Sequence, residues 1–118
     1  MLMTDILDLD SALEYVGGEK ELLEELLIAF VNDKKLDQEE LTRLEKTDKN
    51  EAAKYVHYFK GAGRQLCAGK LNHSGQKLED FLRNRLPESA VLNLDELNQD
   101  FIEAYEQTLQ EIKKILKM

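Results

Sequence analysis

The sequence is poor in the residues that specify anything other than helix. Its 118 residues include one proline, one cysteine and no tryptophan, and Val, Ile and Thr are scarce beside Leu, Glu, Lys, Ala and Gln. This composition favours helices over strands. Because Cys67 is the only cysteine, the chain can form neither a disulfide framework nor a CxxC metal clip. We therefore predict an all-α protein without disulfide bonds.

Targeting and membrane signals are also missing. No apolar run approaches the roughly 20 residues of a membrane span. The first residues have neither the basic region nor the apolar region of a secretory signal peptide. The net charge of -8 argues against nucleic acid, which needs a basic surface. We expect a cytoplasmic protein with no membrane or nucleic-acid partner, folded as a single domain over residues 1–118.

Helix start and stop signals divide the first half of the chain. Asp8 or Asp10 can cap a short first helix, which Gly17-Gly18 would end. A long helix is then predicted for residues 20–46. Its apolar residues recur at three- and four-residue steps: Leu22, Leu23, Leu26, Leu27, Phe30, Val31, Leu41 and Leu44.

The second half of the chain carries three further helix signals. Asp48 and Glu51 have the spacing of a capping box, and Gly69 is a plausible left-handed C-cap for the helix that follows them. Another helix is predicted for residues 70–83, and Asn93 can cap the last one. Four long amphipathic helices joined by short loops predict an antiparallel four-helix bundle, with the short N-terminal helix covering one end.

One stretch differs in charge from the rest of the chain. Residues 55–78 contain no Asp or Glu, although the whole chain has 24 of them, and they contain both histidines. At about 100° per residue, His57 lies on the face of its helix opposite Phe59 and Leu66. Its neighbours at three- and four-residue steps are Ala53, Lys54, Lys60, Gly61 and Arg64. The pattern predicts an exposed His57 surrounded by cations and small residues.

Each of these features has an ordinary explanation, since surface histidines and solvated lysines are common. Gly63 faces inward, where close packing explains it. Gly61 is on the exposed face in mid-helix, where glycine costs roughly 1 kcal/mol against alanine, and it could admit a partner's backbone. An exposed imidazole is largely neutral and nucleophilic at pH 7, and Lys60 could stabilise a phosphoryl group in transit. Together the features favour phosphoryl transfer.

The same stretch resembles the histidine-containing phosphotransfer (HPt) domains of two-component phosphorelays. That family has a His, an apolar residue two positions later, Lys-Gly at three and four, a Leu at fourteen, and Leu-Glu at twenty-one and twenty-two. This sequence shows these as His57, Phe59, Lys60-Gly61, Leu71 and Leu78-Glu79. The segment SALEYVGGEKELLEELLIAFVND also resembles the family's N-terminal part. The chain departs from the pattern at Cys67, where the family usually has Gly, and at Arg64-Gln65, where Ala-Asn is frequent.

The resemblance implies a phosphoryl carrier. His57 would accept a phosphoryl group, at Nε2, from the phospho-aspartate of a receiver domain and pass it to another receiver. Lys60 would stabilise the phosphate, Gly61 would give the partner access, and Lys54 and Arg64 would assist binding. The partners would be receiver domains, of a hybrid histidine kinase and of a downstream regulator, and would supply Mg²⁺. The chain has no cofactor of its own and no nucleotide-binding segment, so it would not be an enzyme that phosphorylates itself.

Other readings remain open from the sequence. A non-catalytic helical adaptor could dock an acidic protein through the same cationic face, with His57 incidental. His73 lies among polar residues and has no expected role, and Cys67 is interpreted as a small core residue. A di-metal site would need inward Glu-x-x-His pairs, which neither histidine has. No base and orienting acid accompany Cys67 or a serine, as a nucleophilic hydrolase would require.

Overall fold

The computed structural model describes residues 2–87 and 93–118. Over these residues it is helical and contains no strand, which confirms the predicted all-α class. The helices are α1 (Leu9–Tyr15), α2 (Lys20–Asn32), α3 (Gln38–Thr47), α4 (Lys49–Gln65), α5 (Gly69–Leu82) and α6 (Leu94–Ile115).

The long helix predicted for residues 20–46 is wrong, because the structure divides it into α2 and α3. Residues 32–35 read Asn-Asp-Lys-Lys and supply no apolar side chain to continue the buried stripe. The Asp37 side chain then accepts a hydrogen bond from the Glu39 amide and caps a new helix. Tyr55 on α4 fixes the linker, since its hydroxyl accepts a hydrogen bond from the Asp37 amide at 3.0 Å. Leu22, assigned to the buried stripe, is exposed.

The end of α4 also differs from the prediction. Gly69 does not terminate this helix, because it is the first residue of α5. The left-handed residue is Cys67, with φ of 54°. The Cys67 amide donates to the carbonyl of Arg64, and the Ala68 amide donates to the carbonyl of Gly63, which completes a helix C-cap. The helix therefore closes at the position where HPt domains usually carry glycine.

The predicted N-caps of the other helices are confirmed. Asp8, rather than Asp10, caps α1 by accepting from the Ser11 amide. Asp48 accepts from the amides at positions 50 and 51 at the start of α4. Asn93 accepts from the amides at positions 95 and 96 at the start of α6. These caps satisfy amides that have no partner within the helix.

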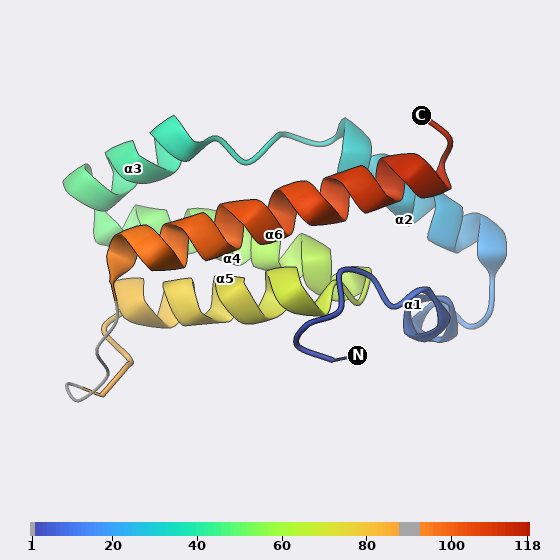
Figure 1. Ribbon diagram of the computed structural model, residues 1–118, viewed down its shortest axis with the longest axis horizontal. Helices are drawn as coiled ribbons and strands as arrows, with labels where there is room; N and C mark the ends of the chain where they lie inside the picture. Colours follow the sequence, from blue (N-terminus) through green and yellow to red (C-terminus); the bar gives the residue numbers. More distant parts are fainter. Residues whose placement is uncertain (1, 88–92) are drawn as a thin grey trace.

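The helices pack around one apolar core. Helices α4 and α5 lie side by side, α6 packs on α5 and contacts α2, and α3 packs on α4 (Figure 1). The short α1 contacts α2. The fully buried large residues come from several helices: Leu41, Val56, Leu66, Leu71, Leu78, Phe101 and Ile112. Because α4 and α5 pack against each other more extensively than any other pair of helices over the described residues, side chains along their shared edge are held in fixed relative positions.

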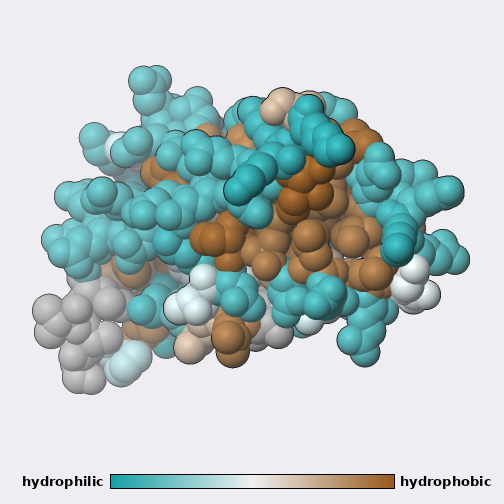
Figure 2. Space-filling model, turned by 45° about the vertical axis from the view of Figure 1, so that its right-hand side comes forward, coloured by the Kyte–Doolittle hydropathy of each residue, from teal (hydrophilic) through white to brown (hydrophobic). Residues whose placement is uncertain are grey.

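Polar side chains cover much of the surface, but not all of it. Figure 2 shows an apolar area at the end of the molecule formed by α1, α2 and the last turns of α6. Exposed apolar side chains at this end include Tyr15, Leu22, Ile28 and Met118. None of the helices over the described residues is both long and apolar enough to cross a membrane.

Candidate functional site

His57 lies in the middle of α4, on the edge that faces α5. Its side chain is 62% exposed, as the helical periodicity predicts. Nδ1 points at the carboxylate of Glu79 on α5, with distances of 3.1 Å to Oε1 and 3.2 Å to Oε2. The imidazole therefore reaches solvent while one of its two nitrogens is fixed by the neighbouring helix.

Glu79 is the centre of the site, and the sequence reasoning assigned it no chemical role. Its side chain is 4% exposed and contacts three basic side chains. Besides His57, the Lys60 ammonium lies 2.8 Å from Oε1 and Nε of Arg83 lies 2.9 Å from Oε2. Each carboxylate oxygen thus has charged or polar donors, as a buried carboxylate requires.

The surroundings of Glu79 keep it ionised. Burial alone would raise the pKa of this carboxyl, but hydrogen bonds from Lys60, Arg83 and His57 outweigh burial and lower the pKa to about 2. An ionised carboxylate can only accept hydrogen bonds, so Nδ1 of His57 is the nitrogen that carries the proton. In the neutral form of the ring Nε2 then has the free lone pair, and none of the described residues hydrogen-bonds it.

Lys60 is less exposed than its helical position predicts. Its side chain is only 12% exposed, and Nζ also donates to Oε1 of Gln76 at 2.9 Å. The lysine stem crosses α5 at Gly75, where an added Cβ would lie 3.0 Å from Cβ of Lys60. Because Lys60 and His57 both contact Oε1 of Glu79, Nζ and Nδ1 lie no more than about 6 Å apart. The structure thus brings this pair together through Glu79.

The other residues expected around His57 divide into two groups. Gly61 has open space where a side chain would be, since an added Cβ would have no atom within 4 Å. Arg64 is exposed and has no ion-pair partner among the described residues. Lys54 instead lies 3.3 Å from Glu51 on its own helix. Ala53 is fully buried, so its placement on the exposed face was wrong.

Gly63 lies on the buried side of α4, as predicted. A Cβ there would be 2.7 Å from Cδ2 of Leu71, so this glycine permits the close approach of α4 and α5. The two nearby glycines therefore differ in what they do: Gly63 allows close helix packing, whereas Gly61 leaves open space at the surface.

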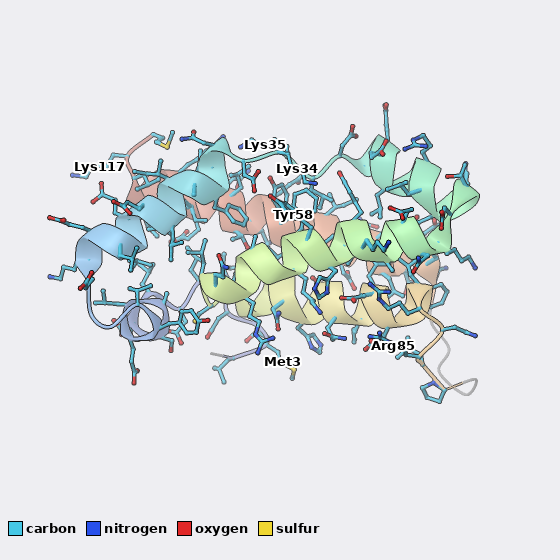
Figure 3. The ribbon with its side chains drawn as sticks, turned by 180° about the vertical axis from the view of Figure 1, so that it is seen from behind. Met3, Lys34, Lys35, Tyr58, Arg85 and Lys117 are labelled. Atoms are coloured by element: carbon cyan, nitrogen blue, oxygen red, sulfur yellow. The ribbon has the colours of Figure 1, made fainter. Side chains whose placement is uncertain are left out.

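Tyr58 is a further residue that the sequence reasoning missed. Its hydroxyl donates to Oδ2 of Asp33, at the end of α2, and Nζ of Lys34 lies 4.0 Å from the centre of its ring. Figure 3 shows Tyr58 and Lys34 together, where the linker after α2 passes α4. The hydrogen bond lowers the pKa of Asp33. Asp33 and Lys34 precede Tyr58 in the sequence by 25 and 24 residues. Contacts over such a separation leave no periodic signal in the sequence.

A shallow groove runs between α2 and α4. It is lined by Leu26, Ala29, Asp33, Ala62 and Gln65, among others, and encloses about 90 Å³. One alanine from each helix, Ala29 and Ala62, lines it beside larger side chains.

His73 and Cys67 lie outside this site. His73 is on α5 but on a different face, where it lines a separate pocket with Lys70 and Lys77. Cys67 is part of the turn after α4, and burial together with Asp8 raises the pKa of its thiol. Among the described residues no three His, Cys, Asp or Glu side chains are grouped so that they could hold a metal ion.

Comparison with known proteins does not assign this arrangement. No protein-family model, no curated protein and no solved structure matches the chain. Functional inference therefore depends on the geometry of His57, Glu79 and Lys60.

Proposed function

We propose that the chain is a phosphoryl carrier of the HPt type, with His57 as the acceptor. The observation that supports this most directly is the exposed ring with its Nδ1–H held by an ionised, buried carboxylate. That arrangement leaves Nε2 as a nucleophile directed away from the protein. We further propose that α2 with α3, α4, α5 and α6 form the antiparallel four-helix bundle of that family, with α1 at one end.

The proposed reaction is a displacement at phosphorus. The Nε2 lone pair of His57 attacks the phosphorus of an aspartyl phosphate in a receiver domain. The N–P bond forms as the bond between phosphorus and the aspartyl oxygen breaks, and the electron pair leaves with that carboxylate. The proton stays on Nδ1, so the ring becomes an imidazolium, and Glu79 stabilises the positive charge as it develops. The reverse reaction passes the group to a second receiver.

Lys60 and Gly61 have complementary parts in this proposal. The Lys60 ammonium, bound to Glu79 and Gln76 in the free protein, is close enough to the ring for its charge to favour the transferred phosphoryl group. Gly61 leaves the surface open for the partner. Arg64 lies two helical turns beyond His57 and can add a looser contact. Mg²⁺ belongs to the receiver domain, and the chain needs no nucleotide.

The adaptor hypothesis is weakened by the internal pairing of the cations. Lys60 is bound to Glu79 and Lys54 contacts Glu51, so the face around His57 offers an acidic partner fewer free charges than the sequence indicates. An adaptor also has no need for a buried carboxylate that fixes one nitrogen of an exposed imidazole. We therefore rank the carrier first.

The decisive experiment compares the two histidines. The protein is mixed with acetyl phosphate, Mg²⁺ and each of a panel of receiver domains, and phosphate on the chain is measured. We expect the wild-type protein and the control His73→Gln to acquire acid-labile, base-stable phosphate, and His57→Gln to acquire none while retaining its helical circular dichroism spectrum. Labelling of His57→Gln would refute the assignment. Binding of a receiver without any labelling of the wild-type chain would favour the adaptor.

A further inference from the structure

A second concave site lies on α5, on a different face from the Glu79 network. The pocket encloses about 370 Å³ between the N-terminal segment, α5 and the first turns of α6. This volume falls in the range of small-molecule sites. Its α5 wall carries Lys70, His73, Ser74 and Lys77, which recur at the three- and four-residue steps of one helical face.

The polar wall of this pocket has donors that the protein leaves unused. Lys70 is held by α6, since Nζ donates to Gln107 at 2.6 Å and lies 3.8 Å from the carboxylate of Glu103. His73 and Lys77, one helical turn apart, have no hydrogen-bond or ion-pair partner among the described residues. The acid in the lining is Asp100, at the exposed side of α6. The lining thus has an excess of basic groups, although the whole chain has a net charge of -8.

The opposite wall carries two apolar side chains beside Thr4 and Asp100, and it is held in place. Leu97 of α6 is 5% exposed and forms part of this wall, and Met3 adds a side chain that is 64% exposed. The turn that carries Met3 is closed by a hydrogen bond of 2.8 Å from the Leu2 amide to the Asp5 carboxylate. The carbonyl of Asp5 accepts from the Lys70 amide at the start of α5. Figure 3 places Met3 beside α5, away from Tyr58 and Lys34.

From this combination we propose that the pocket binds a small organic anion with a phosphate or carboxylate head and an apolar body. Lys77 and the ring N–H of His73 bind the oxyanion, which charge-assisted hydrogen bonds favour. The apolar body lies against Leu97 and Met3, and the flexible thioether of methionine adapts to its shape. Binding would bury apolar surface of Met3 that the free protein exposes to water. This site does not depend on the role of His57.

The test uses phenyl phosphate as the probe, with inorganic phosphate and phenol as its two halves, at constant ionic strength. Nitrogen-15 NMR titrations of the full chain are expected to show saturable shifts of amides at positions 3–5, 70–77 and 97–100. Phenyl phosphate should bind at least about tenfold more tightly than either half, because both walls contribute. Equal affinity for inorganic phosphate would overturn the apolar part of the proposal, and the absence of saturable shifts would overturn all of it.

Variants separate the pocket from general charge attraction. Lys77→Ala is expected to weaken phenyl phosphate about tenfold, because it removes a free, exposed ammonium without disturbing the core. The control Lys114→Ala removes the same charge from the last turn of α6 and should leave affinity unchanged. His57→Gln should also bind normally, which keeps this result separate from phosphoryl transfer. Equal weakening by Lys77→Ala and Lys114→Ala would refute the site.

Discussion

Replacement of Glu79 by glutamine tests the electrostatic centre of the site. The amide has nearly the same shape as the carboxylate, but it carries no charge and presents an NH₂ group, which only donates, in place of one accepting oxygen. Lys60 and Arg83, which are 12% and 24% exposed, would lose their anion while remaining largely out of water. Truncating one partner of a buried ion pair is more costly than removing a surface charge. We therefore expect Glu79→Gln to fold but to be less stable.

The pKa of Glu79 sets both the size and the pH range of this loss. It is about 2 in the folded protein against 4.5 ordinarily, so the ionised carboxylate stabilises the fold above pH 4.5. That contribution is lost as the pH falls from 4.5 through about 2. The shift corresponds to at most about 3 kcal/mol, and partial exposure of its partners brings the expected range to about 1–3 kcal/mol.

The measurement is urea unfolding followed by far-ultraviolet circular dichroism at a series of pH values. Glu79→Gln should be less stable than the wild-type protein at pH 7, and the difference should shrink below pH 4.5 and vanish near pH 2. The control Glu51→Gln removes an exposed carboxylate that contacts Lys54, and should change stability by less than about 1 kcal/mol. A loss of stability at Glu79→Gln that is the same at every pH would refute the electrostatic explanation.

Two further predictions concern the glycines of α4 and a buried carboxylate on α3. Gly61→Ala should stabilise the protein by up to about 1 kcal/mol in thermal or urea unfolding, since the added methyl meets no atom. The same substitution should slow phosphoryl transfer if Gly61 gives a partner access to His57. An unchanged transfer rate would remove that role from Gly61. Gly63→Ala is its matched contrast, and should lose about 1–3 kcal/mol because its methyl would collide with Leu71. Burial raises the pKa of Glu45 despite its hydrogen bond from Asn98, so its charge opposes folding above pH 4.5. Glu45→Gln should therefore raise the free energy of unfolding in urea at pH 7 by about 1 kcal/mol or less, with no gain at pH 4 or below. A gain that persists at pH 4 would contradict a charge effect.

The helix class and most helix ends could be predicted from the sequence because they depend on local chemistry. Asp48 and Asn93 act through their own side chains on amides two or three residues away. The exposure of His57 follows from the period of a single helix. The break between α2 and α3 was missed because leucines on both sides preserve a helical spacing across it. The spacing of Asp37 and Glu40, typical of a capping box, was the signal available in the sequence.

The centre of the candidate site could not be predicted in the same way. Glu79 meets His57 only because α5 folds back on α4, and nothing in a single helix indicates which carboxylate will be buried. The sequence resemblance includes Glu79 as part of a pattern, but gives no reason for it. Lys60 illustrates the same limit: periodicity places its Cα near the surface, whereas its long side chain turns across Gly75 toward the carboxylate. Contacts between α4 and α5 determine both the burial of Glu79 and the direction of the Lys60 side chain.

The turn between α4 and α5 has a mechanical consequence for the candidate site. Residues 66–68 alone connect the two helices, and Cys67 adopts a left-handed backbone there that a glycine would adopt without strain. The imidazole and its carboxylate are both ten to twelve residues from this corner, on opposite arms of one hairpin. A change in the backbone angles of this turn would tilt α4 against α5 and would change the distance between His57 and Glu79, roughly 15 Å away. The alignment of His57 with Glu79 thus depends on a turn that lies outside the candidate site.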